Sequence, residues 1–362
     1  MNTKRLLWLV SFTTPLFITS CWNRTDNPFD FSNRTENVYE LVGVKKNIPE
    51  IISPHRINRK GNFLIVTEDG KIPLDKPIIH ILDIESLELK VSKGINGYGP
   101  NEITDAFLFD AGFSDSTFWV NSTISKRMAE FSLFNNNVLS EREFRQPEAM
   151  FTAFNMQMTS DSTFLCFVAD DTNRLVEFNN KGKRLGGYGD WEKIDGRNDL
   201  DNFLMLMING GWFTSNHDQN IFVKAGAYRD RIEIFEYDTK SFTIIDGPRL
   251  EIPPFNIKGS GKNRMAAFPI ETKYGHRDIS IQDRYIYDLY SGFSELDYRK
   301  DGDLAKTIYV LTRKGDVTAK FNLDKSVKSI AVDESKGKIY AISTDEETGI
   351  IVFDIPKKLL SN

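Results

Sequence analysis

Four histidines, the side chains most often used for acid–base catalysis and metal binding, are scattered along the chain at His55, His80, His217 and His276. No two of them have the spacing that would place both on one helix face as metal ligands. His80 lies in an apolar run, which favours a buried strand histidine, and His217 adjoins a polar turn that begins at Asp218. We therefore expect no metal site and no cofactor, and we assign no catalytic residue.

Charged and aromatic side chains near predicted loops are the better candidates for ligand contact. His276 and Arg277 precede Asp278 in a loop before a strand, where such a trio can face a ligand. Tyr290 ends an aromatic strand and is followed by Ser291, for which a turn is a better interpretation than a nucleophile. We therefore predict His276, Arg277 and Tyr290 as binding residues.

A tryptophan beside a glycine pair is a further candidate. Trp212 follows Gly210 and Gly211, and Trp191 follows a similar pair. An exposed indole can stack on a sugar ring or anchor a protein partner. The alternative is aromatic packing in the core, and we retain Trp212 as a predicted binding residue.

Three motifs that resemble functional sites lack essential residues. No Gly-x-Ser-x-Gly elbow occurs anywhere in the sequence. The segment 259–262 reads Gly-Ser-Gly-Lys but lacks the first glycine and the final Ser or Thr of a P-loop. The acidic segment 195–201 lacks the central glycine and terminal glutamate of an EF-hand. These segments are interpreted as surface loops.

The elements that must position these residues repeat along the chain. A polar turn followed by a short strand of aromatic and β-branched residues occurs six times, and each copy is followed by a second apolar strand. The first strands lie at 63–66, 118–120, 164–166, 221–223, 285–287 and 339–341, and their partners at 78–82, 127–133, 174–178, 231–237, 307–312 and 349–353. Successive copies are separated by the length of one four-stranded propeller blade with its loops.

The repeat predicts an all-β fold, a six-bladed β-propeller of four-stranded blades. The N-terminal strand 37–44 is expected to join the last blade and remove the free edge that an open ring would leave. A pair of β-sandwiches is the alternative, but one period runs through the whole chain and no Pro/Gly linker divides it.

The first twenty residues have the pattern of an export signal. Lys4 and Arg5 precede the uncharged apolar stretch 6–18, which is too short to span a membrane core that needs about 20 residues. The ending Ile-Thr-Ser-Cys at 18–21 resembles a bacterial lipobox. This resemblance implies cleavage before Cys21 and attachment of a lipid to its sulfur. An ordinary signal peptide with a chance cysteine is the alternative.

The sequence therefore divides into a lipoprotein signal peptide (1–20), a tether (21–36) and the propeller (37–362). Two acyl chains on Cys21 would anchor the protein firmly to a membrane. The second cysteine, Cys166, lies in an apolar strand and is expected to be a buried thiol. We expect the protein in the envelope of a Gram-negative bacterium, anchored to the outer membrane, with the periplasmic and surface faces both open.

Composition excludes several classes of protein. The 362 residues are 40% hydrophobic and 27% charged, as in soluble globular proteins. The 46 Lys and Arg residues are outnumbered by 51 Asp and Glu residues, which gives a net charge of −5. Because no basic excess exists to neutralise phosphates, we expect no nucleic-acid partner.

A glycine-rich segment links two predicted blades. Residues 97–103 read Gly-Tyr-Gly-Pro-Asn-Glu-Ile. Glycine allows positive φ and close approach of the backbone, and Glu102 can cap the amides of a tight crossing between blades. The alternative is a ligand-binding loop at the propeller mouth. On that alternative Gly97, Gly99, Asn101 and Glu102 are predicted binding residues.

This segment resembles the G-x-G-P-x-E signature of TolB-like six-bladed propeller lipoproteins. The run 285–292, Tyr-Ile-Tyr-Asp-Leu-Tyr-Ser-Gly, resembles a second signature of that family, and 307–355 fits its last turn-and-strand pattern. The resemblance extends from about residue 38 to the end and implies an exported, lipid-anchored propeller. It supplies no catalytic residues, and the segment 255–276 cannot be placed on its pattern.

The predicted function is a non-catalytic binding or scaffold module for a protein or glycan partner, because a propeller presents loops from every blade around a channel. The alternative is a lyase or hydrolase that acts on a polysaccharide or an ester at the propeller mouth. A third possibility is an accessory subunit of an envelope assembly.

Overall fold

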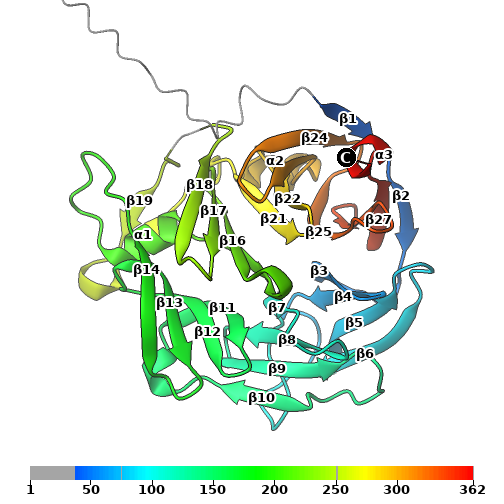
Figure 1. Ribbon diagram of the computed structural model, residues 1–362, viewed down its shortest axis with the longest axis horizontal. Helices are drawn as coiled ribbons and strands as arrows, with labels where there is room; N and C mark the ends of the chain where they lie inside the picture. Colours follow the sequence, from blue (N-terminus) through cyan, green and yellow to red (C-terminus); the bar gives the residue numbers. More distant parts are fainter. Residues whose placement is uncertain (1–36, 75, 250–251, 362) are drawn as a thin grey trace, which may run out of the picture.

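The computed structural model of the protein describes residues 37–74, 76–249 and 252–361. Six antiparallel sheets are arranged around a common centre (Figure 1), which confirms the predicted all-β six-bladed propeller. The predicted signal peptide, the tether and Cys21 lie outside the described residues.

Each blade is a meander whose first strand lies innermost. The inner strands are β3 (Pro54–Lys60), β7 (Leu108–Asp110), β11 (Ala153–Ser160), β15 (Gly211–Asn216), β21 (His276–Ile281) and β25 (Val327–Asp333). The second strands are β4 (Phe63–Glu68), β8 (Thr117–Ser122), β12 (Thr163–Val168), β16 (Ile221–Gly226), β22 (Tyr285–Tyr290) and β26 (Lys338–Ser343). The third strands are β5 (Pro77–Asp83), β9 (Arg127–Ser132), β13 (Asn173–Asn179), β17 (Arg231–Glu236), β23 (Thr307–Thr312) and β27 (Gly349–Asp354). The outer strands are β6 (Leu89–Ile95), β10 (Arg142–Arg145), β14 (Arg184–Asp190), β18 (Ser241–Asp246), β24 (Val317–Leu323) and β2 (Val44–Asn47).

The second and third strands contain the repeats that the sequence predicts. These strands are buried on both faces because each blade packs between two neighbours; in β9, for example, every residue is buried. They are therefore rich in apolar residues on both faces, instead of showing the alternation typical of a sheet with one solvated face. A tight turn joins the first strand β3 to the second strand β4, and Gly61, with φ of 56°, provides its left-handed residue.

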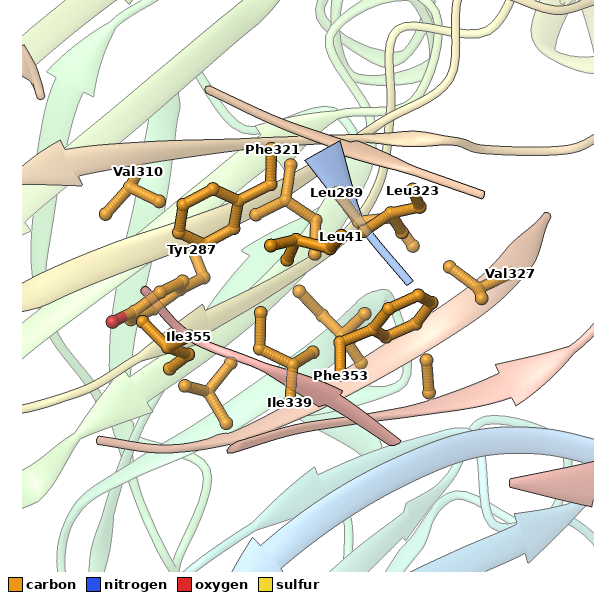
Figure 2. Packing of buried hydrophobic residues seen from close by; sticks show 14 of the residues in the cluster. Leu41, Tyr287, Leu289, Val310, Phe321, Leu323, Val327, Ile339, Phe353 and Ile355 are labelled. Carbon is orange, nitrogen blue, oxygen red and sulfur yellow. The ribbon is translucent and has the colours of Figure 1, made fainter. Parts of the chain in front are cut away.

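The N-terminal segment closes the ring, as predicted, but it contributes two short strands. β2 is the outer strand of the last blade, with Val44 opposite Val352 of β27. β1 (Val38–Leu41) adds a parallel fifth strand to the preceding blade, beside β24. Leu41 is buried in the cluster between these blades, with Phe321 and Phe353 among its neighbours (Figure 2). The N-terminal segment therefore ties the last two blades to each other.

The central channel has two different ends. At the start face, the inner strands begin; the connections from each outer strand to the next blade and from each second to third strand also lie there. At the end face, the inner strands finish. Since neighbouring strands are antiparallel, this assignment follows from the pairing order in each sheet.

The longest insertions all belong to the start face. Helix α1 (Asn202–Ile208) precedes β15, and the hairpin of β19 (Asn256–Lys258) and β20 (Met265–Ala267) precedes β21. Helix α2 (Glu295–Asp301) lies between β22 and β23. The remaining helix, α3 (Lys357–Leu360), follows β27 and lies at the end face. The hairpin accounts for the segment 255–276 that could not be placed from sequence. Within the described residues, every helix is too short or too polar to cross a membrane.

Candidate binding site

One side chain from each blade lines the start-face mouth of the channel. In five blades it is the second residue of the inner strand, and in the second blade it immediately precedes β7. These six residues, which we call the mouth ring, are His55, Phe107, Phe154, Trp212, Arg277 and Lys328. Each is half-buried, and nearly all of their neighbours in the chain are buried. The ring is thus the part of the inner strands that solvent reaches at this end.

The mouth ring has an aromatic half and a cationic half. Phe107, Phe154 and Trp212 come from the second, third and fourth blades and line a cavity of about 500 Å³. The basic side chains come from the first, fifth and sixth blades. The halves touch, because the rings of His55 and Phe107 are 5.5 Å apart and the Arg277 guanidinium lies 5.5 Å from the centre of the Trp212 ring. The mouth therefore offers apolar surface and positive charge side by side.

The three basic residues of the ring occupy the same local structure. Register shifts fall between Pro54 and Arg56, between His276 and Asp278, and between Val327 and Ser329. His55, Arg277 and Lys328 are therefore the unpaired residues of three β-bulges. A bulge redirects one side chain out of the regular alternation of a strand, and here it directs a basic side chain to the mouth in three blades.

These basic groups lack charged partners within the described residues. Arg277 makes cation–π contacts with Trp212 and Tyr274 but no ion pair, and its buried Nε has no hydrogen-bond acceptor. Burial lowers the pKa of Lys328, which also has no ion pair or hydrogen bond. Burial, together with the nearby Arg56, lowers the pKa of His55 to about 4. At neutral pH the ring thus contains a neutral histidine and an unpaired arginine and lysine.

Asp278, next to Arg277, has several partners, in contrast to the basic groups of the ring. Its carboxylate forms an ion pair with Arg56 and accepts hydrogen bonds from the Ser329 hydroxyl and from the Ile330 amide at 2.9 Å. Arg56, Asp278 and Ser329 belong to the first, fifth and sixth blades and are all buried. The Asp278 carboxylate therefore joins three blades at the centre of the propeller.

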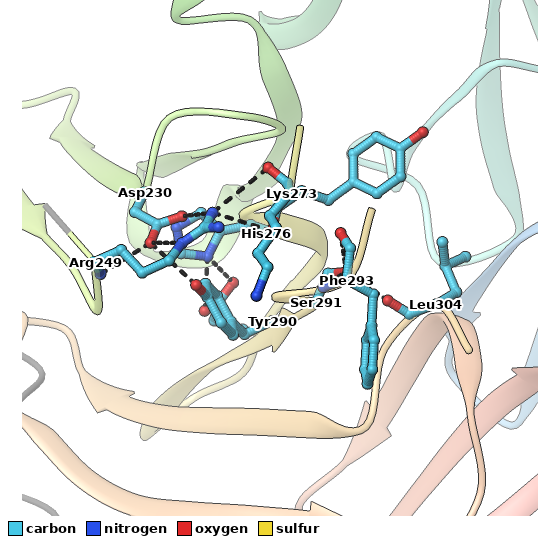
Figure 3. A network of polar contacts seen from close by, with 10 residues as sticks. Asp230, Arg249, Lys273, His276, Tyr290, Ser291, Phe293 and Leu304 are labelled. Carbon is cyan, nitrogen blue, oxygen red and sulfur yellow. Dashed lines mark hydrogen bonds and ion pairs between the residues drawn. The ribbon is translucent and has the colours of Figure 1, made fainter. Parts of the chain in front are cut away.

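Of the predicted trio at 276–278, only Arg277 reaches the mouth. His276 is fully buried, and its Nδ1 lies 2.8 Å from both carboxylate oxygens of Asp288. Tyr290 is also buried and donates its hydroxyl proton to Asp230 at 3.0 Å (Figure 3). Asp230 in turn accepts from the Arg249 guanidinium at 2.9–3.0 Å. His276 and Tyr290 thus belong to a polar network behind the mouth.

Trp212 lies on the inner strand β15, at the mouth. Its indole N–H donates to the His276 carbonyl at 2.9 Å, which holds the ring across the boundary between the fourth and fifth blades. The Arg56 guanidinium lies 4.5 Å from the centre of the same ring. By contrast, Trp191 donates to the Asp171 carbonyl and packs in a cluster between blades.

The glycine-rich segment crosses from the first blade to the second on the start face. The Glu102 carboxylate accepts from the Gly99 amide at 2.7 Å, which is the capping role expected from sequence. A Cβ added at Gly97 would lie 2.1 Å from a Glu102 oxygen, and Asn101 has φ of 59°. Arg127 donates to the carbonyls of Gly99 and Glu102. These contacts hold the backbone of the segment in place. The predicted role of its residues in ligand binding stays a prediction.

The end face contains a different cavity, of about 420 Å³, and several buried polar groups beside it are paired. His217 Nε2 lies 2.7 Å from Asp110, and the Ser215 hydroxyl donates to Gln157 at 2.7 Å. Ser215, His217 and Asp110 resemble a hydrolase triad in type. However, Ser215 and Asp110 both approach the same nitrogen, Nε2, so the imidazole cannot relay a proton between them. This arrangement is a structural link across the channel.

Other sequence candidates take structural roles. In the segment 195–201, Arg197 pairs with Asp199, and Asp201 caps α1 through the Leu204 amide. No group of three or more acidic, His or Cys side chains among the described residues is arranged to hold a metal ion. Both ring nitrogens of His80 are hydrogen-bonded in the first blade, to Ser92 and Glu68. Cys166 is a buried free thiol, as expected, and burial raises its pKa.

Trp212 and Arg277 are predicted from the sequence, whereas the other four ring residues, His55, Phe107, Phe154 and Lys328, are not. A signal was present in three blades, because His55, Arg277 and Lys328 each stand two residues before an isoleucine at the centre of an inner strand. The repeat is visible on the second and third strands, and it does not by itself align the inner strands with one another. Phe107 and Phe154 could have been found by the same alignment.

A family model described as TolB-like 6-blade propeller-like matches residues 30–335. No curated protein matches the chain. Among solved structures, the chain is similar to a member of the DUF4221 family from Bacteroides vulgatus, with 12% identity, a TM-score of 0.56, and coverage of 87% of this chain and 98% of that chain.

Two further structures match more weakly. One is the Cps50 (Swd1) β-propeller domain of Myceliophteria thermophila, with 9% identity, a TM-score of 0.46, and coverage of 87% of this chain and 98% of that one. The other is the RRP9 WD40 repeats, with 6% identity, a TM-score of 0.47, and coverage of 84% and 100%. The similarity to the Bacteroides structure shows the fold alone, whereas the family model covers most of the sequence. The chain therefore belongs to the TolB-like six-bladed propeller family.

Proposed function

We propose that this protein is a non-catalytic binding module that docks a protein partner on its start face. The β-propeller fold is compatible with a binding or scaffold role, and the three long insertions all extend that face. The single observation that carries the proposal is an apolar arc beside the mouth ring. The enzymatic alternative has weaker support, since the end-face serine, histidine and aspartate share one imidazole nitrogen.

The apolar arc consists of exposed side chains on five successive start-face connections, around the first to third blades. Its members are Ile52, Leu74, Tyr98, Ile124 and Phe151. Each is at least half exposed, and Leu74 and Tyr98 reach 72%. Exposed apolar residues that gather on one face of a soluble body indicate a protein interface. The arc therefore favours a protein over a glycan, which would be held mainly by polar groups.

The charge beside the arc restricts the partner further. Arg277 and Lys328 of the mouth ring have no acidic partner within the described residues. A protein surface with apolar side chains around an acidic group would complement both features. Aromatic and arginine side chains are also the residues that most often dominate binding energy at interfaces.

The proposal can be tested by photocrosslinking in the cells that make the protein. A photoreactive phenylalanine analogue would replace Tyr98 on the start face or, as a matched control, Phe134 on the end face, which is 69% exposed. We expect a discrete adduct of fixed mass from position 98 and none from position 134. Equal adducts from positions 98 and 134 would overturn the proposal. So would the absence of any adduct when the photoreactive analogue replaces either Tyr98 or Ile124.

We also propose that the module is exported and lipid-anchored through Cys21, at the outer membrane of a Gram-negative envelope. The support is the lipobox-like ending at 18–21 after a short apolar stretch. The variant Cys21→Ala should then leave the membrane fraction, because the acylated sulfur is its only proposed attachment. Retention of the variant in the membrane fraction would contradict a lipid anchor.

A further inference from the structure

We propose that the mouth ring is a carboxylate-binding site, in which Arg277 and Lys328 hold the anion and the aromatic half packs against the group that bears it. The inference rests on the proposed docking function, since the carboxylate would belong to the partner, as an acidic side chain or a chain terminus.

Unsatisfied donors converge on this site. Arg277 Nε is buried without an acceptor, and so is Nη1 of Arg56, the arginine whose other nitrogen binds Asp278. Both guanidiniums lie over the Trp212 ring, at 4.5 and 5.5 Å from its centre. Buried polar groups in native proteins almost always have partners, so two orphaned N–H groups at one mouth call for an acceptor.

Two acidic side chains near the mouth, Glu68 and Asp278, already have partners. Glu68 accepts from the amides of Ile52 and Ser53 and from His80, and Asp278 is held by Arg56 and two donors of the sixth blade. Asp69 influences the pKa of both His55 and Lys328, but it forms no ion pair with either within the described residues. A carboxylate supplied from outside would therefore neutralise charge that has no partner at the mouth within the described residues.

The surroundings favour a carboxylate on an apolar carrier. A guanidinium offers paired donors that match the two oxygens of a carboxylate. Phe107, Phe154 and Trp212 line the adjoining cavity of about 500 Å³, which is wide enough for a ring or a branched aliphatic group. Because His55 stays neutral at pH 7, the charge at the mouth comes from Arg277 and Lys328, with Arg56 beside them already paired.

The test uses calorimetric titration of the intact protein with benzoate, and with benzamide as the neutral molecule of the same shape. We expect benzoate to bind and benzamide to bind at least tenfold more weakly. Arg277→Met and Lys328→Met should each weaken benzoate by about tenfold, the ratio expected for one lost charge-assisted hydrogen bond. Lys273→Met, at an exposed start-face lysine outside the ring, should bind benzoate as the wild type does.

Equal binding of benzoate and benzamide, or unchanged binding by both ring variants, would overturn the inference. Preference for inorganic phosphate over benzoate would also overturn it and would identify a phosphate site instead. The photocrosslinking result separates the two proposals. Benzoate binding without a start-face adduct would leave the carboxylate site but remove the docking partner, whereas an adduct without benzoate binding would do the reverse.

Discussion

The two ends of the propeller channel are both hollow, but they differ in whether their buried charged side chains have partners. At the end face, His217 and Asp110 form an ion pair, and Lys60 donates to the carbonyl of Ala111. At the start face, Arg277 and Lys328 have neither an ion pair nor a hydrogen bond within the described residues. The cavities have similar volumes, so size does not distinguish them.

This difference separates the polar groups that stabilise the fold from those that are available to a ligand. A buried charge that is paired and hydrogen-bonded contributes to the structure, and removing its partner is strongly destabilising. A buried charge without a partner reduces stability in the free protein and is compensated when a ligand of opposite charge binds. The same contrast separates the adjacent residues Arg277 and Asp278 on β21.

The largest effect is expected at the seam between the first, fifth and sixth blades. Asp278→Asn removes the charge that pairs with buried Arg56, and it disturbs the contacts with Ser329 and Ile330. The free energy of unfolding should fall by about 3–5 kcal/mol in urea denaturation. Asp354→Asn breaks an exposed pair with Lys338 and should change it by less than about 1 kcal/mol. Equal effects of the two variants would show that Asp278 does not join the blades.

A smaller, pH-dependent effect is expected at the end face. Burial lowers the pKa of His217, but Asp110 more than offsets this, so the pKa is raised above 6.5; Lys60 opposes and Asp218 adds to the shift. Burial raises the pKa of Asp110, but His217 and the amides of Met158 and Gly112 bring it below 3.8. The pair therefore stabilises the fold fully between about pH 4 and 6.5, and its contribution is lost as pH rises through the folded-state pKa of His217.

The variant His217→Gln isolates this contribution. The difference in unfolding free energy between wild type and variant should be about 2 kcal/mol at pH 6 and should shrink above neutrality, as measured by urea denaturation at each pH. It should also shrink on acidification below the pKa of Asp110. A difference that stays constant from pH 6 to 9 would show that His217 is not charged in the pair.

The sequence was sufficient to predict the propeller, because repeated β-rich strands have a period that only a few architectures accommodate. It also predicted the capping role of Glu102, since glycine spacing and a carboxylate suffice for a tight crossing. The mouth ring does not follow from the repeat of the second and third strands alone. His55, Phe107 and Lys328 differ in type and are far apart in the chain, and they meet only because the blades close into a ring. The burial of His276 and Tyr290 also depends on contacts with neighbouring strands.

The smallest change in stability is expected on the apolar arc. Tyr98→Asp and the end-face control Phe134→Asp replace side chains of similar exposure, so each should shift the unfolding free energy by no more than about 0.5 kcal/mol. Only Tyr98→Asp should reduce the yield of the adduct formed from a photoreactive group at position 124. Equal loss of adduct in both variants would remove the distinction between the two faces.

The most direct test of the contrast between paired and unpaired charge is the unfolding free energy of Arg277→Met, measured with and without benzoate. Without benzoate, the variant should be as stable as the wild type or slightly more stable, because an unpaired buried charge has been removed. Benzoate at 100 times its dissociation constant should stabilise the wild type by about 2.7 kcal/mol and the variant by roughly half as much, the consequence of a tenfold weaker affinity. A variant that loses several kcal/mol without benzoate, and that benzoate stabilises as much as the wild type, would show that Arg277 supports the fold and not a ligand.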